Sequence, residues 1–268
     1  MTKNEHQAQA PRHSMTRLAE RAHAHSAAAG HAEPHTVFQT STMAALLSGV
    51  YDGDVTVAEL LTHGDFGLGT FNGLDGEMVI LDGVCHHLRA DGSAERAADS
   101  ELTPFAVVTR FQPQVTFTVE TPTTRSELTE LISAHVTSAN LIHALKVSGC
   151  FTQMRTRTVA RQQRPYPPLT EATEGQTESV FDHVEGTLAG YLTPDYEQGI
   201  SVAGYHLHFL SGDHARGGHS LDFTLRSGTV AIDTETDLHL SMPQSGPFLT
   251  AALSSKALDE QVRQAEGN

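Results

Sequence analysis

Apolar and polar residues alternate along much of the chain, a pattern that predicts β-strands with one buried face. The alternation is strict in GYHLHF, where Tyr205, Leu207 and Phe209 are separated by two histidines. Short runs of this kind recur between Gly, Asn and Asp residues, which favour turns. The predicted strands cover residues 69–72, 77–81, 84–89, 105–111, 114–119, 141–158, 180–191, 199–210, 220–229, 230–232 and 238–242.

Apolar residues spaced by three and four predict only a few helices. The clearest helix covers 124–135, where Leu128, Leu131 and Ile132 fall on one face. Two short helices are expected, each beginning near a Ser or Thr side chain that can cap it, and one helix ends the chain. These three predicted helices cover residues 40–48, 55–61 and 249–266.

Together these elements predict an α/β fold of the α+β kind, with two mixed, mainly antiparallel β-sheet lobes and a few flanking helices. Residues 1–35 carry six of the 17 histidines and lack periodic apolar positions, so we expect a disordered tail. Residues 36–165 form the expected N-terminal lobe, a mixed β-sheet with helices. Pro, Thr and Glu are concentrated in 164–176, which indicates the boundary. Residues 166–268 form the expected C-terminal lobe, which is β-rich and carries the terminal helix.

The charge balance excludes some functions. The formal net charge is −15, from 17 Lys and Arg residues against 32 Asp and Glu residues, whereas a nucleic-acid binder needs basic patches. No apolar run approaches the roughly 20 residues that a membrane-spanning helix needs. The N-terminal residues also lack the apolar stretch of a signal peptide, so we expect a soluble, cytoplasmic protein.

The two cysteines, Cys85 and Cys150, limit the chemistry further. Both lie in apolar or strand-like stretches, where a small buried hydrophobic side chain is their expected role. Two cysteines make neither a disulfide scaffold nor a cysteine-rich zinc site. Any metal site must therefore be built from histidines and carboxylates.

Histidines with the spacing of metal ligands occur in 204–223, GYHLHFLSGDHARGGHSLDF. His206 and His208 are two residues apart in a predicted strand, so both imidazoles point to one face. The chain then turns and His219 begins the next strand, so a hairpin returns its ring to the same place. Three neutral imidazoles with a free fourth position are typical of catalytic zinc, and iron, copper and manganese also bind histidine. His214, in the turn, is the alternative third ligand.

Several longer stretches of the chain resemble the α-acetolactate decarboxylase family. They are QTSTMAALLSGVYDG, THGDFGLGTFNGLDGEMVILDG, RTRTVARQ, GYLTPDYEQGISVAGYHLHFLSGDHARGGHSLDF and the acidic C-terminal helix, and together they span residues 37–268. The resemblance implies a two-domain α/β fold, usually dimeric, with zinc bound by three histidines, and we place this metal site between the two lobes. It also implies conversion of 2-acetolactate to acetoin and carbon dioxide.

The same resemblance implies roles for individual residues. They are His206, His208 and His219 as zinc ligands, Arg157 as the catalytic arginine, Glu77 and Glu266 as catalytic carboxylates with Glu260 in reserve, and Thr70 as a further active-site residue. Zinc would stabilise an enediolate, the arginine would bind negative charge, and a buried carboxyl would deliver a proton to one face. Strand alternation puts Arg155 and Arg157 on the same face, so the residues alone do not distinguish them.

Two other classes of protein fit the histidine spacing alone. One is a different enzyme with three histidines on its metal, such as a hydrolase or a cupin-like iron dioxygenase. The other is a non-catalytic metal-binding module, in which a fourth protein ligand would close the site. The resemblance favours a small-molecule substrate, 2-acetolactate, and a homodimer, with no nucleic-acid or membrane partner.

Overall fold

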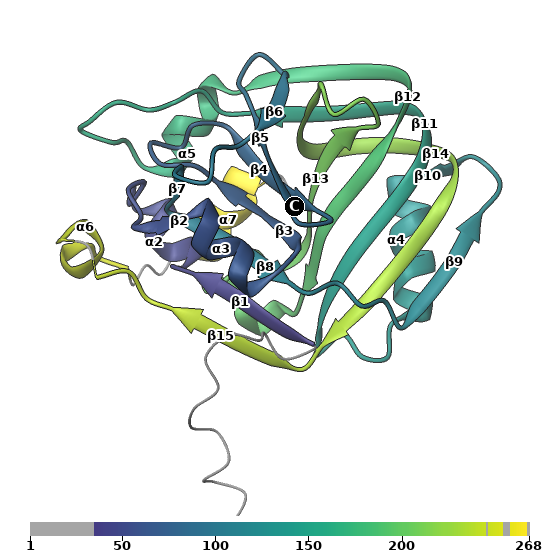
Figure 1. Ribbon diagram of the computed structural model, residues 1–268, viewed down its shortest axis with the longest axis horizontal. Helices are drawn as coiled ribbons and strands as arrows, with labels where there is room; N and C mark the ends of the chain where they lie inside the picture. Colours follow the sequence, from purple (N-terminus) through teal and green to yellow (C-terminus); the bar gives the residue numbers. More distant parts are fainter. Residues whose placement is uncertain (1–34, 245, 254–257, 267–268) are drawn as a thin grey trace, which may run out of the picture. The chain divides into compact units, whose positions relative to one another are not determined.

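The first of two large sheets among the described residues has seven strands, in the order β15-β1-β8-β3-β4-β5-β6 (Figure 1). The structure is a computed structural model and describes residues 35–244, 246–253 and 258–266. Neighbouring strands are antiparallel except β1 and β15, which run parallel. The strands are β1 (Thr36–Thr40), β3 (Phe66–Thr70), β4 (Glu77–Leu81), β5 (Val84–Leu88), β6 (Ala94–Arg96), β8 (Phe105–Thr109) and β15 (Asp237–Ser241).

The second sheet has six strands, and all of its pairings are antiparallel. Its order is β10-β14-β11-β12-β13, with further pairings of β14 to β9 and to β13. The strands are β9 (Val115–Val119), β10 (Thr123–Thr124), β11 (Ile142–Thr158), β12 (Thr177–Thr193), β13 (Gly204–Ser211) and β14 (Gly217–Glu235). The short strands β2 (Val55–Thr56) and β7 (Leu102–Thr103) form a separate pair.

The two sheets face each other across an inner apolar core. This core joins residues such as Leu68 of the first sheet to residues such as Ala189 of the second. A second cluster covers the outer face of the second sheet, where α4 (Arg125–His135) packs through Ile132 (Figure 1). A third cluster covers the outer face of the first sheet, with α3 (Val57–His63). Polar side chains that point inward from both sheets therefore meet in one buried space.

Threonine side chains begin the three helices that the sequence predicted in the first half of the chain. The Thr42 hydroxyl accepts a hydrogen bond from the Ala45 amide (3.2 Å) at the start of α2 (Met43–Leu47). Thr56 caps α3 in the same way, and Thr124 begins α4 with a full capping box. Each cap satisfies an amide that lacks a partner at a helix start, so these three predictions are confirmed.

The C-terminal part of the chain forms two helices instead of the one predicted over 249–266. They are α6 (Gly246–Thr250) and α7 (Leu258–Glu266). Val262 and Ala265 of α7 are buried in the inner core. The remaining short helices are α5 (Leu169–Ala172), η1 (Thr173–Gly175) and η2 (Asp195–Glu197). Among the described residues, every helix is too short or too polar to span a bilayer.

The predicted class, an α/β fold with mainly antiparallel sheets, is confirmed. The predicted strand 77–81 coincides with β4. The predicted strand 69–72 overlaps β3 only at residues 69 and 70, since β3 begins at Phe66, ends at Thr70 and is followed by a turn. The segments 220–229 and 230–232 are one continuous strand, β14. Several very short strands, including β2 and β10, carry too few residues to show alternation in the sequence.

Sheet membership does not follow the expected boundary between residues 165 and 166. Strands β9, β10 and β11 precede this point and pair within the second sheet, whereas β15 follows it and pairs with β1. Partner choice depends on long-range pairing, which local composition does not encode. The expected tail lies outside the described residues except for His35, whose Nδ1 lies 3.0 Å from an Asp233 oxygen.

Candidate active site and metal centre

Three histidines of the second sheet meet on its inner face. His208 of β13 is the direct cross-strand partner of His219 of β14, and His206 lies two residues earlier on the same face as His208. One ligand atom from each ring lies within 4.8 Å of the other two. The three side chains form the only such His, Cys, Asp and Glu cluster in the part of the chain that the structure describes.

Backbone carbonyls set the orientation of two of these rings. Nδ1 of His208 lies 2.7 Å from the Met78 carbonyl oxygen, and Nε2 of His219 lies 3.2 Å from the Glu266 carbonyl oxygen. Each of these nitrogens donates, because a carbonyl only accepts. The opposite nitrogens, Nε2 of His208 and Nδ1 of His219, therefore keep free lone pairs, and both are buried without a hydrogen-bond partner.

The protonation state of the three imidazoles suits a metal ion. Burial lowers the pKa of His208 to about 4 and holds the pKa of His206 and of His219 well below the usual value for histidine. Nearby positive charge from Arg157 contributes in the same direction. Neutral imidazoles with unpartnered lone pairs are the form that binds zinc and related divalent ions, so the side chains present fit such an ion.

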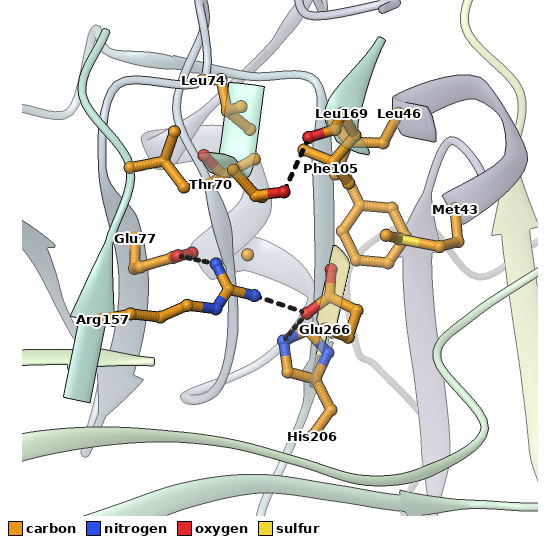
Figure 2. A pocket seen from close by; sticks show the side chains of 13 residues that line it. Met43, Leu46, Thr70, Leu74, Glu77, Phe105, Arg157, Leu169, His206 and Glu266 are labelled. Atoms are coloured by element: carbon orange, nitrogen blue, oxygen red, sulfur yellow. Dashed lines mark hydrogen bonds and ion pairs between the residues drawn. The ribbon is translucent and has the colours of Figure 1, made fainter. Parts of the chain in front are cut away.

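Arg157 lies between two buried carboxylates (Figure 2). Its Nη1 is 3.5 Å from Oε1 of Glu77 and its Nη2 is 3.1 Å from Oε2 of Glu266. Nη2 also donates to the Ala265 carbonyl oxygen (2.8 Å), so the guanidinium holds the end of α7 against β11. Arg157 is only 4% exposed, which makes this a buried charge network.

The two carboxylates connect the arginine to the histidines. Oε2 of Glu266 lies 3.7 Å from Nε2 of His206 and 3.7 Å from Nδ1 of His219, and Oε2 of Glu77 lies 3.7 Å from Nε2 of His208. Burial raises the pKa of Glu77 to about 7, with Arg157 opposing the shift. Burial raises the pKa of Glu266 as well. Glu77 can therefore hold a proton near neutral pH, and the pKa of Glu266 is shifted in the same direction.

Thr70 and a tight turn shape the side of the pocket next to Glu77. The Thr70 hydroxyl donates to the Gly76 carbonyl oxygen (2.6 Å), so it contacts backbone instead of another site residue. Gly76 has φ +73°, and a Cβ there would lie 2.1 Å from the Leu88 carbonyl oxygen. Only glycine fits at position 76, directly before Glu77, which explains the glycine in the LDGE sequence.

Apolar side chains form the opposite wall of the pocket. Met43 and Leu46 of α2 and Phe105 of β8 line it together with Leu169 (Figure 2). The sequence did not predict these residues, because their apolar character gives no signal that separates them from the core. It also missed the Met78 carbonyl, since a backbone acceptor carries no sequence signature.

The structure brings together all seven residues that the sequence singled out for the site. They are Thr70, Glu77, Arg157, His206, His208, His219 and Glu266, and each is buried or nearly so. The two alternative residues, His214 and Glu260, lie outside the pocket. His214 is exposed in the turn, where its ring lies 4.9 Å from that of His86, and Glu260 is exposed on α7.

The register of β11 agrees with the prediction that Arg155 and Arg157 share a face, because Arg155 pairs with Val180 and Arg157 with Glu178 without interruption. Arg155 is exposed and its Nε lies 3.9 Å from Oε2 of Glu178, whereas Arg157 points into the pocket. The pairing of β11 with β14 is irregular between Arg155 and Thr156. The extra residue is Leu221 of β14, so the alternation along β11 continues. Arg157 belongs to the site through its position along β11, where it is the direct partner of His219.

These features define the class of the chain. It is a two-sheet α/β protein with a buried cluster of histidines, carboxylates and one arginine that could hold a divalent metal. A sequence model of the alpha-acetolactate decarboxylase family matches residues 37–255. The chain therefore belongs to the alpha-acetolactate decarboxylase family.

Individual relatives agree with this assignment. Alpha-acetolactate decarboxylase of Methylococcus capsulatus is 47% identical over 237 residues, which is 88% of this chain and 90% of the relative. The Klebsiella aerogenes enzyme is 46% identical over 230 residues, or 86% and 88% of the two chains. The crystal structure of alpha-acetolactate decarboxylase from Bacillus subtilis strain 168 superposes with a TM-score of 0.85 at 39% identity, covering 87% of this chain and 100% of that chain.

Proposed function

We propose that the protein is a carboxy-lyase that converts 2-acetolactate to acetoin and carbon dioxide, with zinc held by His206, His208 and His219. One observation carries the proposal: Arg157 and two buried carboxylates surround three buried, neutral imidazoles whose free nitrogens converge. Family membership supports the decarboxylation of acetolactate. The histidine geometry supports the metal.

The chemistry needs a place for negative charge. As carbon dioxide leaves a β-keto acid, an electron pair moves onto the ketone oxygen and gives an enediolate. When bound, the metal supplies a Lewis acid for this developing charge, which is worth several kcal/mol. The contribution of the chain is to place three imidazoles together and to hold His208 and His219 in one tautomer each, by the carbonyls of Met78 and Glu266.

Arg157 binds the negatively charged part of the substrate. Its guanidinium is fixed by the Ala265 carbonyl and by Glu77, so it is oriented before substrate arrives. The free space in the pocket is about 30 Å³, room for roughly one water molecule. Substrate binding therefore exchanges the Glu266 carboxylate for the substrate carboxylate at Nη2 of Arg157, and leaves the Glu266 carboxyl beside the histidines.

Glu77 and Glu266 are the proton sources. Both carboxyls lie within 3.7 Å of imidazole nitrogens of the cluster, and burial raises the pKa of both. A carboxyl with a pKa near neutrality donates a proton most effectively at that pH. Because Glu77 stays against Arg157 and Glu266 stays beside the histidines, the proton reaches the enediolate from one face and the product is a single enantiomer.

The apolar wall accommodates the methyl groups of the substrate. Met43, Leu46 and Phe105 face the polar groups across the pocket, so the carboxylate and hydroxyl of the substrate point toward Arg157 and the histidines. This arrangement fits a small branched keto acid better than a sugar or a nucleotide, which need more polar contacts.

The test combines metal analysis with product analysis on the purified protein. Racemic 2-acetolactate should release carbon dioxide well above the spontaneous rate, the acetoin should be one enantiomer, and the protein should contain about one zinc ion per chain. A hydrolase or a dioxygenase would release no more carbon dioxide than buffer alone. Racemic acetoin would contradict the proposed proton delivery. The expected homodimer and the cytoplasmic location stay predictions.

A further inference from the structure

The turn between β3 and β4 has an unusual backbone conformation. It joins Thr70 to Glu77, and Gly73, Leu74 and Gly76 all have positive φ. Leu74 is not a glycine, yet its φ is +53° and its side chain is 4% exposed and lines the pocket. A non-glycine residue in this region costs on the order of 1 kcal/mol, so surrounding groups must hold the turn.

A single buried imidazole, that of His87 on β5, contacts both ends of this turn. Its ring stacks on the Phe71 ring with centroids 3.7 Å apart and planes inclined by 15°. Its Nε2 donates to the Asp75 carbonyl oxygen. His87 is 1% exposed and pairs with Met78 on the face of the first sheet that points away from the histidine cluster. It therefore supports the turn from behind and touches none of the proposed catalytic groups.

Glu101 fixes the imidazole of His87 from the other side. Nδ1 of His87 lies 2.8 Å from Oε1 of Glu101, and Oε2 of Glu101 accepts from the Ala98 amide (2.6 Å). Both ring nitrogens are engaged: Nε2 with the Asp75 carbonyl and Nδ1 with the Glu101 carboxyl group. The result is a chain of contacts from the Ala98 backbone through Glu101 and His87 to the carbonyl of Asp75.

The Asp75 side chain is held as well. Oδ2 of Asp75 lies 3.0 Å from Nη1 of Arg89, 3.8 Å from Nη1 of Arg161 and 4.0 Å from Nε2 of His87. Asp75 stands two residues before Glu77, and the carbonyl of Gly76 between them accepts from Thr70. A shift of the Asp75 backbone would thus be passed directly to the Glu77 carboxylate.

We propose that His87 is a positioning residue for the reaction, which holds the β3–β4 turn so that Glu77 stays against Arg157 and Leu74 stays in the pocket wall. The proposal rests on the proposed function, because its kinetic readout is acetolactate turnover. His87 acts through the Asp75 carbonyl and the Phe71 ring. Displacement of a positioned acid by about 1 Å lowers turnover by up to about 100-fold.

The test is His87→Phe, which keeps a ring for stacking on Phe71 and removes both hydrogen bonds. Turnover of acetolactate should fall by about 10- to 100-fold with KM changed by less than about threefold and with zinc content unchanged, because the defect lies in proton delivery. His87→Gln, which can still donate to Asp75, should recover part of the lost turnover. Amide hydrogen exchange over residues 71–77 should be faster in His87→Phe than in the parent protein.

His86→Phe is the matched control. His86 is the neighbour of His87 on β5 and is 5% exposed, but it points to the opposite face, where its ring meets His214. Equal turnover and equal exchange in the two Phe variants would overturn the proposal. If His87→Phe does not fold, Glu101→Gln serves instead, since it retains the shape of the side chain and weakens only the hold on Nδ1.

The two proposals fail in different ways. If the parent protein releases no carbon dioxide above background, the proposed function fails, and the exchange experiment still decides whether His87 holds the turn. If the parent protein is active and the exchange rates over residues 71–77 match in all variants, the positioning role of His87 is wrong and the proposed function is unaffected.

Discussion

The two ends of β14 bury acidic groups in opposite ways. At one end, near His219, the carboxylates of Glu77 and Glu266 share the guanidinium of Arg157. At the other end, Asp233 and Glu235 are 0% and 2% exposed. Asp233 accepts from the Gln112 amide and contacts His35, whereas neither carboxylate oxygen of Glu235 has a hydrogen-bond partner among the described residues.

The comparison shows how each end of β14 accommodates buried acidic groups. The guanidinium of Arg157 opposes the rise in pKa that burial causes in Glu77 and Glu266. Glu235 lacks such a group, and the nearby Thr109 hydroxyl donates to the Thr36 carbonyl instead (3.0 Å). Burial therefore raises the pKa of Glu235 to about 8, so it is accommodated by holding a proton. One end is organised for chemistry and the other for stability.

The largest expected effect comes from removing a metal ligand. His206→Ala should lose bound zinc and lower turnover by about 1,000-fold or more, since a Lewis acid is worth several kcal/mol. Metal content and carbon dioxide release are measured together. His143→Ala, at an equally buried histidine of β11 that is hydrogen-bonded outside the site, should keep its zinc. A normal zinc content in His206→Ala would contradict the metal assignment.

The second largest effect is expected from removing the guanidinium of Arg157, which Glu77 and Glu266 share. Arg157→Ala leaves two buried carboxylates without a partner, so the free energy of unfolding should fall by about 3–5 kcal/mol. Turnover should fall by about 100- to 1,000-fold, because the fixed charge for the substrate is lost. Arg155→Ala, at the exposed arginine two residues earlier, is the control and should change neither quantity measurably. Similar urea midpoints and rates for the two variants would remove the distinction between the ends of β14.

Replacing one acid of the site should have a smaller effect. Glu77→Gln keeps the shape of the side chain and should retain zinc, while turnover falls by about 100-fold, since Glu266 remains as a second acid. Steady-state rates and metal content measure this result. Glu178→Gln, at an exposed glutamate of β12, is the matched control. An unchanged rate in Glu77→Gln would show that Glu77 has no part in proton transfer.

The smallest effect is expected at the far end of β14, and it depends on pH. The pKa of Glu235 is about 8 in the folded protein and near 4.5 when unfolded. The folded protein therefore holds more protons between these values, and the stability that this group contributes is complete below about pH 4.5 and is lost as the pH rises to about 8. Urea unfolding of Glu235→Gln should show a smaller loss of stability between pH 5.5 and 8.5 than the parent, by about 1–3 kcal/mol.

Asp237→Asn provides the control for that measurement. Asp237 is exposed two residues beyond Glu235, so its amide variant should keep the pH dependence of the parent protein. If Glu235→Gln follows the parent curve as closely as Asp237→Asn does, the proton on Glu235 does not stabilise the fold.

Local spacing was sufficient to predict the histidine cluster. His206 and His208 share a face because a strand repeats every two residues, and His219 returns through a short hairpin. The caps at Thr42 and Thr56 were also visible, because each depends on contacts within a few residues. The β-rich class followed from the same alternation.

Features that depend on distant partners could not be predicted from the pattern. The burial of Arg157 and the exposure of Arg155 depend on which distant segments cover each part of β11, and no local sequence shows this. The strand β15 follows residue 165 and yet belongs to the first sheet, because it pairs with β1. The two strands are about 200 residues apart in the chain. Resemblance to a family, not periodicity, pointed to Glu266, since α7 reaches the site only through packing against the inner core.

The pairing of His208 with His219 has a consequence for how the protein reaches its native state. A slip of one residue between β13 and β14 would turn His219 to the opposite face of the ladder and separate the two rings. Ion capture during refolding would then favour chains whose hairpin has the correct register. The rate at which metal becomes resistant to chelators would report when that register forms.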